Sequence, residues 1–270
     1  WIQAAGLVGS EGILPIAPYL ERVGSAISES TEPQTSKWLL IPTVFWWGSS
    51  DFAINVVLAI SAGASVALIV GVLPGPAALT LWVCYLSLLH AGRIFLTFQW
   101  DILLVEILFL AAFLGPWKLF DRLARNREPS SIVRLLLWFL FFRLMFESGM
   151  VKFQSYGMPG DINTWRDFTA LDFHYWTQPL PAWTSWHFHH LPKGAHYLSL
   201  WITYAVELVA PFLFFAPRRF RNLAVAAQGL LQLAIMLSGN YGFFNLLALL
   251  LCVPLVDDQS LPTKLRTKLA

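Results

Sequence analysis

The segment Ile132–Gln154, with the sequence IVRLLLWFLFFRLMFESGMVKFQ, is long and apolar enough to cross a lipid bilayer. It nevertheless carries Arg143 and Glu147 in its second half and Lys152 near its end. A charged side chain in hydrocarbon costs from a few kcal/mol to about 10 kcal/mol or more, so it persists when it is paired, faces a polar cavity or takes part in function. Because Arg143 and Glu147 lie four residues apart, we expect them to share a helix face and form a buried pair, with Lys152 about one turn further along.

The composition excludes an ordinary soluble domain. Of the 270 residues, 57% are hydrophobic and only 13% are charged, and the mean hydropathy is +0.59. The 13 Trp and 21 Phe residues are typical of a protein with aromatic side chains at membrane interfaces. Cys84 and Cys252 lie in apolar runs and are interpreted as buried hydrophobic residues. The net charge of +2 gives no indication of a nucleic-acid partner. We predict an all-α, polytopic membrane protein with the lipid bilayer as a partner.

Apolar runs of about 17–25 residues predict the membrane spans. The candidates, of which the last two are short, are Phe52–Leu73, Ala77–Phe98, Ile102–Phe120, Ile132–Met150, Ala195–Phe215, Leu223–Ser238 and Phe243–Val256. The opening residues, WIQAAGL, resemble the end of a helix and have no Met before them. We therefore expect a fragment with about seven spans that lacks most of an eighth, N-terminal span.

Basic residues orient these spans. They gather in two connections and after the last span, at Arg122, Arg125 and Arg127, at Arg218, Arg219 and Arg221, and at Lys264, Arg266 and Lys268. With seven alternating spans all three groups fall on one side, which the positive-inside rule makes cytoplasmic. The predicted organisation is an outer segment at 1–51, four transmembrane helices at 52–150, an outer loop at 151–194, three transmembrane helices at 195–256 and a cytoplasmic tail at 257–270.

The first span has a small residue at every fourth position. These residues are Ala59, Gly63, Ala67 and Gly71. Because small side chains let helix backbones approach closely in membranes, we interpret this stripe as a helix-packing face.

The outer loop at 151–194 is rich in aromatic residues and histidines. It contains Trp165, Trp176, Trp183, Trp186, His174, His187, His189 and His190. Long ordered loops are often functional, so we expect this one to be folded and docked on the membrane surface. His187 and His189 could be neighbouring metal ligands, with His174 or an Asp as the third. The spacing matches no zinc motif, so we favour hydrogen-bonding histidines in an aromatic lid and expect neither a metal nor another cofactor.

Polar residues within the other spans have two interpretations. Arg93, Asp101 and Glu106 flank the turn between the second and third spans, and Glu207, Gln228 and Gln232 lie in later spans. They could make hydrogen bonds between helices, which we favour for the two glutamines. They could instead line a polar cavity open to the outer side, and for Arg143, Glu147 and Glu207 both interpretations stay open. Arg93 and Asp101 should leave the bilayer on the same face and could interact there.

Several long motifs follow one another along the chain. They are GSEGILP at 9–15, FQWD at 98–101, RLMFESGMVK at 143–152, TWRD at 164–167, LDFHY at 171–175, TQPLP at 177–181, HHLP at 189–192, ELVAPF at 207–212 and GNYGFFN at 239–245. With these motifs the chain resembles the lipase maturation factor family of multi-pass membrane proteins, from its start to about Asp258. The resemblance adds Trp165, Asp172, His174, His189, His190, Asn240 and Asn245 to the candidate functional residues.

The resemblance implies a maturation factor with secreted client proteins such as lipases. The animal members of the family lie in the endoplasmic reticulum membrane, where they support the folding and assembly of these clients, and they carry a soluble domain after the membrane part. A bacterial member would lie in the inner membrane instead.

A shorter resemblance surrounds Lys152. Ser148–Lys152, with Trp165 downstream, is similar to a segment of the vitamin K-dependent gamma-carboxylase family, in which a Lys at this motif position is the catalytic base. It implies the alternative of a membrane enzyme acting on a lipid or quinone-like substrate, with Lys152 as base and Glu147 and Arg143 beside it. A transporter is a third possibility, for which the sequence shows no inverted repeat.

Overall fold

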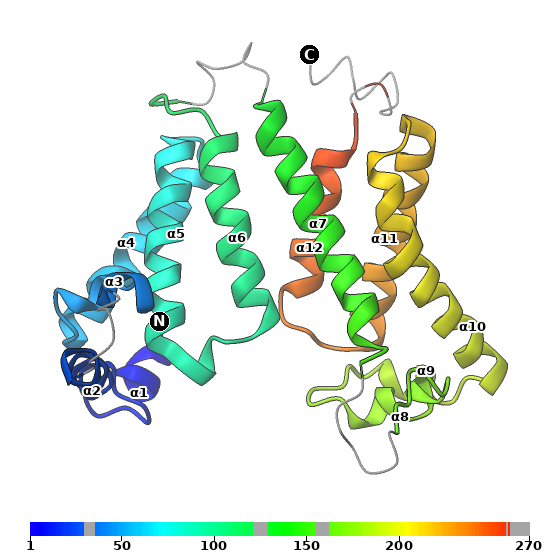
Figure 1. Ribbon diagram of the computed structural model, residues 1–270, viewed down its shortest axis with the longest axis horizontal. Coiled ribbons are helices and arrows are strands. Elements are labelled where there is room, and N and C mark those ends of the chain that lie inside the picture. The colour runs from blue at the N-terminus through cyan, green and yellow to red at the C-terminus, as the bar shows by residue number, and fades with distance from the viewer. Residues whose placement is uncertain (30–35, 121–128, 155–161, 258, 260–270) are drawn as a thin grey trace. The chain divides into compact units, whose positions relative to one another are not determined.

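The computed structural model describes residues 1–29, 36–120, 129–154, 162–257 and 259 (Figure 1). The secondary structure in these ranges is helical, apart from an isolated bridge between Val72 and Phe120, which confirms the all-α prediction. The chain forms two compact units, Trp1–Val133 and Arg134–Ala270.

The first unit is built on three long helices. Its elements are α1 (Ala4–Val8), α2 (Ile16–Glu29), α3 (Lys37–Leu40), η1 (Val44–Trp46), α4 (Asp51–Ile69), α5 (Pro74–Gly92), η2 (Arg93–Phe95) and α6 (Gln99–Leu114). Helix α5 packs against both α4 and α6, and the short helices α1 to α3 gather at one end of α4 (Figure 1). Buried Ile16, Phe45 and Ile54 join these short helices to α4 in one apolar core.

The GSEGILP motif closes the start of α4. The Ser10 backbone N–H and hydroxyl each donate to the Asp51 carboxylate at 2.7 Å. A Cβ on Gly9 would lie 2.6 Å from the Ala5 carbonyl oxygen, so only glycine fits this tight turn. Gly9 and Ser10 of this motif therefore have a structural role, which is to fix the turn after α1 to the first residue of α4.

The second unit contains a group of buried polar side chains that includes Lys152, Glu207 and Gln228. Its elements are α7 (Ser131–Val151), α8 (Ala170–Thr177), α9 (Ser185–His189), α10 (Lys193–Tyr204), the π-helical turn η5 (Ala205–Val209), the 3₁₀ segment η6 (Ala210–Phe215), α11 (Arg218–Ser238), α12 (Phe244–Cys252) and η7 (Val253–Leu255). Helices α8 and α9 lie at the end of the unit where α7 finishes and α10 begins (Figure 1). The side chains of Gln178 and Ser185 hold them there by donating to the Ser238 carbonyl oxygen at the end of α11.

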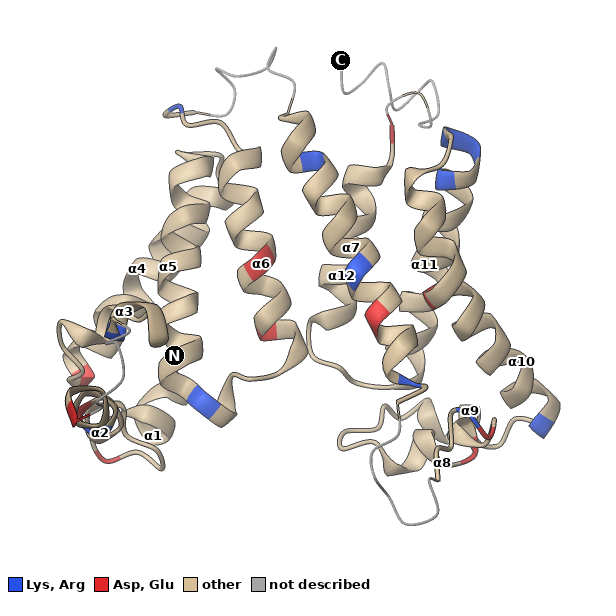
Figure 2. Ribbon diagram, viewed as in Figure 1, with Lys and Arg blue, Asp and Glu red and all other residues tan. Residues whose placement is uncertain are grey.

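The protein is an integral membrane protein. Four helical stretches are long and apolar enough to cross a bilayer, namely Asp51–Ile69, Pro74–Phe95, Lys193–Phe215 and Arg218–Ser238. Each of the seven predicted spans overlaps a helical segment, although α4 ends at Ile69 and not at Leu73, and α6 ends at Leu114 and not at Phe120. Helices α6 and α12 are shorter than the four stretches, and α7 carries more charge. Within the predicted spans charged residues lie mainly at the helix ends, with those on α6 and α7 and Glu207 of η5 as the exceptions (Figure 2).

Seven bilayer crossings and the inner and outer assignments therefore stay predictions. The basic groups Arg122, Arg125 and Arg127, and Lys264, Arg266 and Lys268, lie outside the described residues, as does most of the tail at 257–270.

The small-residue stripe of α4 does not pack as expected. Ala59 and Gly63 are exposed, and a Cβ added to Gly63 would meet no atom within 4 Å. Helix α4 instead buries Ile54 and Val57 near its first turns. Spacing alone does not show which face of a helix is covered.

Candidate functional site

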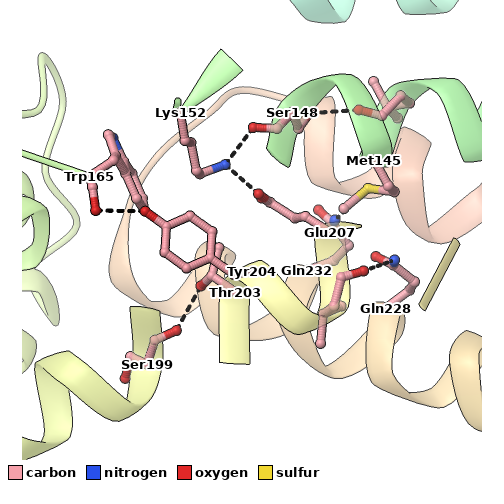
Figure 3. Close-up of polar contacts among 12 residues, drawn as sticks. Met145, Ser148, Lys152, Trp165, Ser199, Thr203, Tyr204, Glu207, Gln228 and Gln232 are labelled. Atoms are coloured by element: carbon pink, nitrogen blue, oxygen red, sulfur yellow. Dashed lines mark hydrogen bonds and ion pairs between the residues drawn. The ribbon is translucent and has the colours of Figure 1, made fainter. Parts of the chain in front are cut away.

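Lys152 and Glu207 form an ion pair in the second unit. The Lys152 Nζ lies 2.5 Å from the Glu207 Oε2, and the two side chains are only 13% and 6% exposed. Lys152 also donates to the Ser148 carbonyl oxygen at 2.8 Å, and its ammonium lies 4.9 Å from the centre of the Trp165 ring (Figure 3). A carboxylate, a carbonyl oxygen and a π face thus surround one ammonium, which satisfies a buried cation.

Trp165 is held in place from two sides. The buried Asn163 accepts hydrogen bonds from the backbone N–H groups of Trp165 and Arg166, and its amide donates to the Lys152 carbonyl oxygen at 2.9 Å. From α10, the Tyr204 hydroxyl donates to the Trp165 carbonyl oxygen at 2.6 Å. The chain after α7 therefore folds back over Lys152.

Glu207 lies in the π-helical turn η5. Pro211, shortly after it in the sequence, explains why the helix is irregular here. Pro211 has no N–H and its ring clashes with the carbonyl four residues earlier, so an α-helix cannot pass through it undisturbed. The Ala210 N–H accordingly bonds to the Ala205 carbonyl, five residues back. In that register the Val206 carbonyl would pair with the N–H that Pro211 lacks. The buried Gln228 side chain of α11 donates to it instead, at 2.7 Å.

Gly149 allows α7 to reach this turn. A Cβ at Gly149 would lie 2.5 Å from the Leu208 Cδ2 and 3.2 Å from the Glu207 Cβ. The absence of a side chain at this position therefore brings the Lys152 and Glu207 side chains within contact.

A second polar group is buried beside the pair. The Asn245 Nδ2 donates to the Gln232 Oε1 at 2.7 Å, and the Gln232 Nε2 lies 3.6 Å from the Met145 sulfur. Hydrogen bonds between helices, the interpretation favoured for the glutamines, are confirmed, because these contacts link α7, α11 and α12.

Asp172 and His174 of α8 contact two different parts of the second unit. His196 of α10 lies 2.9 Å from the Asp172 Oδ1 through its Nδ1, and 3.0 Å from the Phe188 carbonyl oxygen through its Nε2. The His174 Nε2 lies 2.9 Å from the Tyr241 hydroxyl in the turn before α12. Burial, and secondarily the charge of Lys152, lower the pKa of His174 below its usual range.

The expected buried pair of Arg143 with Glu147 is wrong. Glu147 is exposed, and the carboxylate that faces Lys152 belongs to Glu207. The inward face of α7 runs through Phe141 and Met145 to Lys152, and Glu147 lies off this stripe. Arg143 is half-buried one turn earlier.

The first unit keeps Arg93 and Asp101 apart. The Arg93 guanidinium lies 4.5 Å from the centre of the Tyr19 ring, whereas the buried Asp101 accepts a 2.5 Å hydrogen bond from the Tyr85 hydroxyl. The expected contact between Arg93 and Asp101 is therefore not formed. Glu106 is half-buried on α6.

His189 and His190, at the end of α9, contact aromatic rings. The rings of His190 and Trp186 are 4.1 Å apart and those of His189 and Trp176 are 6.3 Å apart. Among the described residues, no group of three His, Cys, Asp or Glu side chains could hold a metal ion. Asn240 has a local role, because its Oδ1 accepts from the Gly242 N–H in the turn between α11 and α12.

Sequence reasoning missed several residues of the site. These are Asn163, Gln178, His196 and Tyr204. The first two stand in or beside the TWRD and TQPLP motifs, and that proximity was the available signal.

The whole chain has relatives among known proteins. Residues 1–263 match the family described as "Lipase maturation factor transmembrane domain". Lipase maturation factor 2 of Mus musculus is 40% identical over 97% of this chain and 38% of its own length, and the Homo sapiens protein of that name is 39% identical over the same shares. Lipase maturation factor 1 of Mus musculus is 33% identical over 96% of this chain and 44% of its own length. The chain thus spans less than half the length of these relatives, and no solved structure matches it.

Proposed function

Because the chain belongs to the lipase maturation factor family, we propose that it is the membrane part of a protein that assists the folding and assembly of secreted lipases. The observation that carries this proposal is the family match over residues 1–263, and the buried Lys152–Glu207 pair supports a structural role for the membrane part. An ion pair that joins two helical segments and satisfies a buried charge supports a structural role, as a scaffold, for this site, and the Lys152→Arg experiment below separates that role from catalysis.

The scaffold fixes the outer part of the second unit to its spans. The ion pair joins α7 to η5, and Asn163 and Tyr204 tie down the chain that follows α7. Gln178, together with Thr184 donating to the Leu237 carbonyl oxygen, attaches the α8–α9 segment to the end of α11. We infer that this segment is on the side where clients mature, the lumen of the endoplasmic reticulum in a eukaryotic cell or the periplasm in a bacterium.

Replacement of Lys152 by arginine tests the scaffold against the enzyme. The full-length protein is expressed in cells that lack their own maturation factor, and secreted lipase activity is measured together with the melting temperature in detergent. Lys152→Arg should keep both, because a guanidinium also pairs with a carboxylate but does not release its proton near neutral pH. Normal melting with abolished lipase maturation would overturn the scaffold in favour of a catalytic base.

Labelling of introduced cysteines tests the sidedness. Asp167, just before α8, and Arg219, in the first turn of α11, lie at opposite ends of the described second unit, because the α8–α9 segment is bonded to the last residue of α11, and both are exposed. Cysteines at these positions should react with an impermeant thiol reagent from opposite sides of sealed vesicles. A reaction of both from one side would contradict the inferred orientation of α11.

A further inference from the structure

We propose that the α8–α9 segment lies in the headgroup layer of the membrane that the spans cross, with an aromatic patch among the lipids. The aromatic patch consists of Trp176, Trp183, Trp186, His187, His189 and His190. It is separate from the Lys152 site and goes beyond the proposed function.

Ring contacts join these six side chains into one surface. The centroid distances are 6.4 Å for Trp183 and His187, 5.1 Å for His187 and Trp186, and 4.1 Å for Trp186 and His190. The chain of contacts continues from His190 to His189 at 5.1 Å and from His189 to Trp176 at 6.3 Å. The three tryptophans therefore present one continuous face.

This face is turned outward. Trp176, Trp183 and Trp186 are 60%, 84% and 63% exposed. The other face of α8 is covered, because Leu171 and Tyr175 pack with Leu200 in a core of their own. Both faces of the segment thus carry apolar side chains, and one face packs against the protein while the other is uncovered.

The composition favours lipid as the cover. From Phe173 to Pro192 the sequence contains no Asp, Glu, Lys or Arg. Indole and imidazole rings combine an apolar body with a polar edge, which suits the headgroup layer of a bilayer. An uncharged tryptophan surface of this kind in bulk water would be an aggregation hazard.

The position of the segment also places it at the bilayer boundary. Gln178 and Ser185 hold it to the last residue of the α11 span, and α10 starts directly after it. The exposed Leu191 leads from the patch into α10, whose exposed side chains Leu198 and Trp201 belong to an apolar span. The patch therefore stands directly before the start of an apolar span, where Lys193 is the first charged residue after it.

Collision measurements on nitroxide labels test the proposal in the full-length protein. A single cysteine replaces Trp183 on a background without other reactive cysteines, and the protein is placed in phosphatidylcholine nanodiscs. Leu180→Cys serves as a second label site that keeps all three tryptophans, because Leu180 is 64% exposed. Leu198→Cys is the lipid-facing control, and Asp167→Cys, at an exposed charged position, is the aqueous control.

We expect labels at Trp183 and Leu180 to collide more often with oxygen than with a water-soluble nickel chelate, as at Leu198. Asp167 should show the reverse. Labels at both sites that are as accessible to nickel as Asp167, in protein with an unchanged melting temperature, would overturn the proposal. Nickel access that is lost only when a lipase is added would also overturn it and assign the patch to client binding.

Discussion

The two units of this protein bury polar groups in different ways. In the first unit each buried polar contact joins only two segments, such as Tyr85 of α5 with Asp101 of α6, or Thr43 with the Ser87 carbonyl oxygen of α5. In the second unit Lys152, Glu207 and Gln228 connect α7, η5 and α11. In a continuous helix the backbone N–H and C=O groups bond to one another. A span interrupted by a proline leaves a carbonyl oxygen without its N–H donor, so a side chain of a neighbouring helix must donate to it.

The largest expected effect is the loss of one partner of the ion pair in the second unit. Lys152→Met and Glu207→Leu should each lower the free energy of unfolding by about 3–5 kcal/mol, because the surviving charge stays buried. The double variant should lose less than the sum of the two. Unfolding in mixed micelles measures all three, and strict additivity would show that the two side chains do not interact.

Gly149→Ala tests the close approach of α7 to η5. The new Cβ would press on the Leu208 side chain, and overpacking of this kind costs about 1–3 kcal/mol. Gly63→Ala in α4 of the first unit is the matched control, because its Cβ would meet no atom within 4 Å. The control should be neutral or stabilise by up to about 1 kcal/mol. Equal losses in the two variants would remove the contrast between the units.

Tyr85→Phe tests whether the Tyr85–Asp101 hydrogen bond of the first unit contributes to stability independently of the Lys152–Glu207 pair. It removes the hydrogen bond to Asp101 and should cost about 1.5 kcal/mol, since the acceptor is a buried carboxyl group. Combined with Lys152→Met, its effect should be additive, because the contacts described for Tyr85 and Asp101 have no residue in common with those described for Lys152. A coupling energy well above the error of the unfolding measurement would contradict this.

The smallest effect concerns pH. The folded-state pKa of His174 lies below its ordinary value of 6.5, so the unfolded chain binds the proton more readily. The stability from neutral His174 is present above about pH 6.5 and is lost as the pH falls toward the lowered pKa. His174→Gln should flatten the fall in melting temperature between about pH 7.5 and pH 5.5. Tyr241→Phe removes the hydrogen bond but keeps the titrating group, so it should leave that fall largely in place.

Much of the helical frame could be predicted from apolar runs alone. The segment expected at Ile132–Met150 is the helix Ser131–Val151, because the length of an apolar run reports a span directly. Lys152 and Glu207 were each recognisable as polar residues in apolar surroundings. Their contact was not predictable, because 55 residues separate them and no local period links α7 with η5.

Local reasoning failed where it had to choose a helix face. The four-residue spacing of Arg143 and Glu147 was read as an inward pair, although Glu147 is exposed. A spacing gives the relative direction of two side chains, but the direction of the core depends on packing against other helices. Pro211 was a usable sign of the irregular turn, and its position within a predicted span indicated where the α-helix would change.

The number of residues in the π-helical turn Ala205–Val209 also sets the direction in which the side chains of η6 point relative to those of α10. Each residue of an α-helix turns the chain by about 100°, so one residue deleted from this turn would rotate η6 by about that angle relative to α10. The rings of Phe212 and Phe214 now meet Phe142 and Phe141 of α7 at 5.1 and 5.0 Å, and after such a deletion they would point elsewhere. The number of residues in this turn, more than their identity, therefore decides whether the second half of the span finds its neighbour.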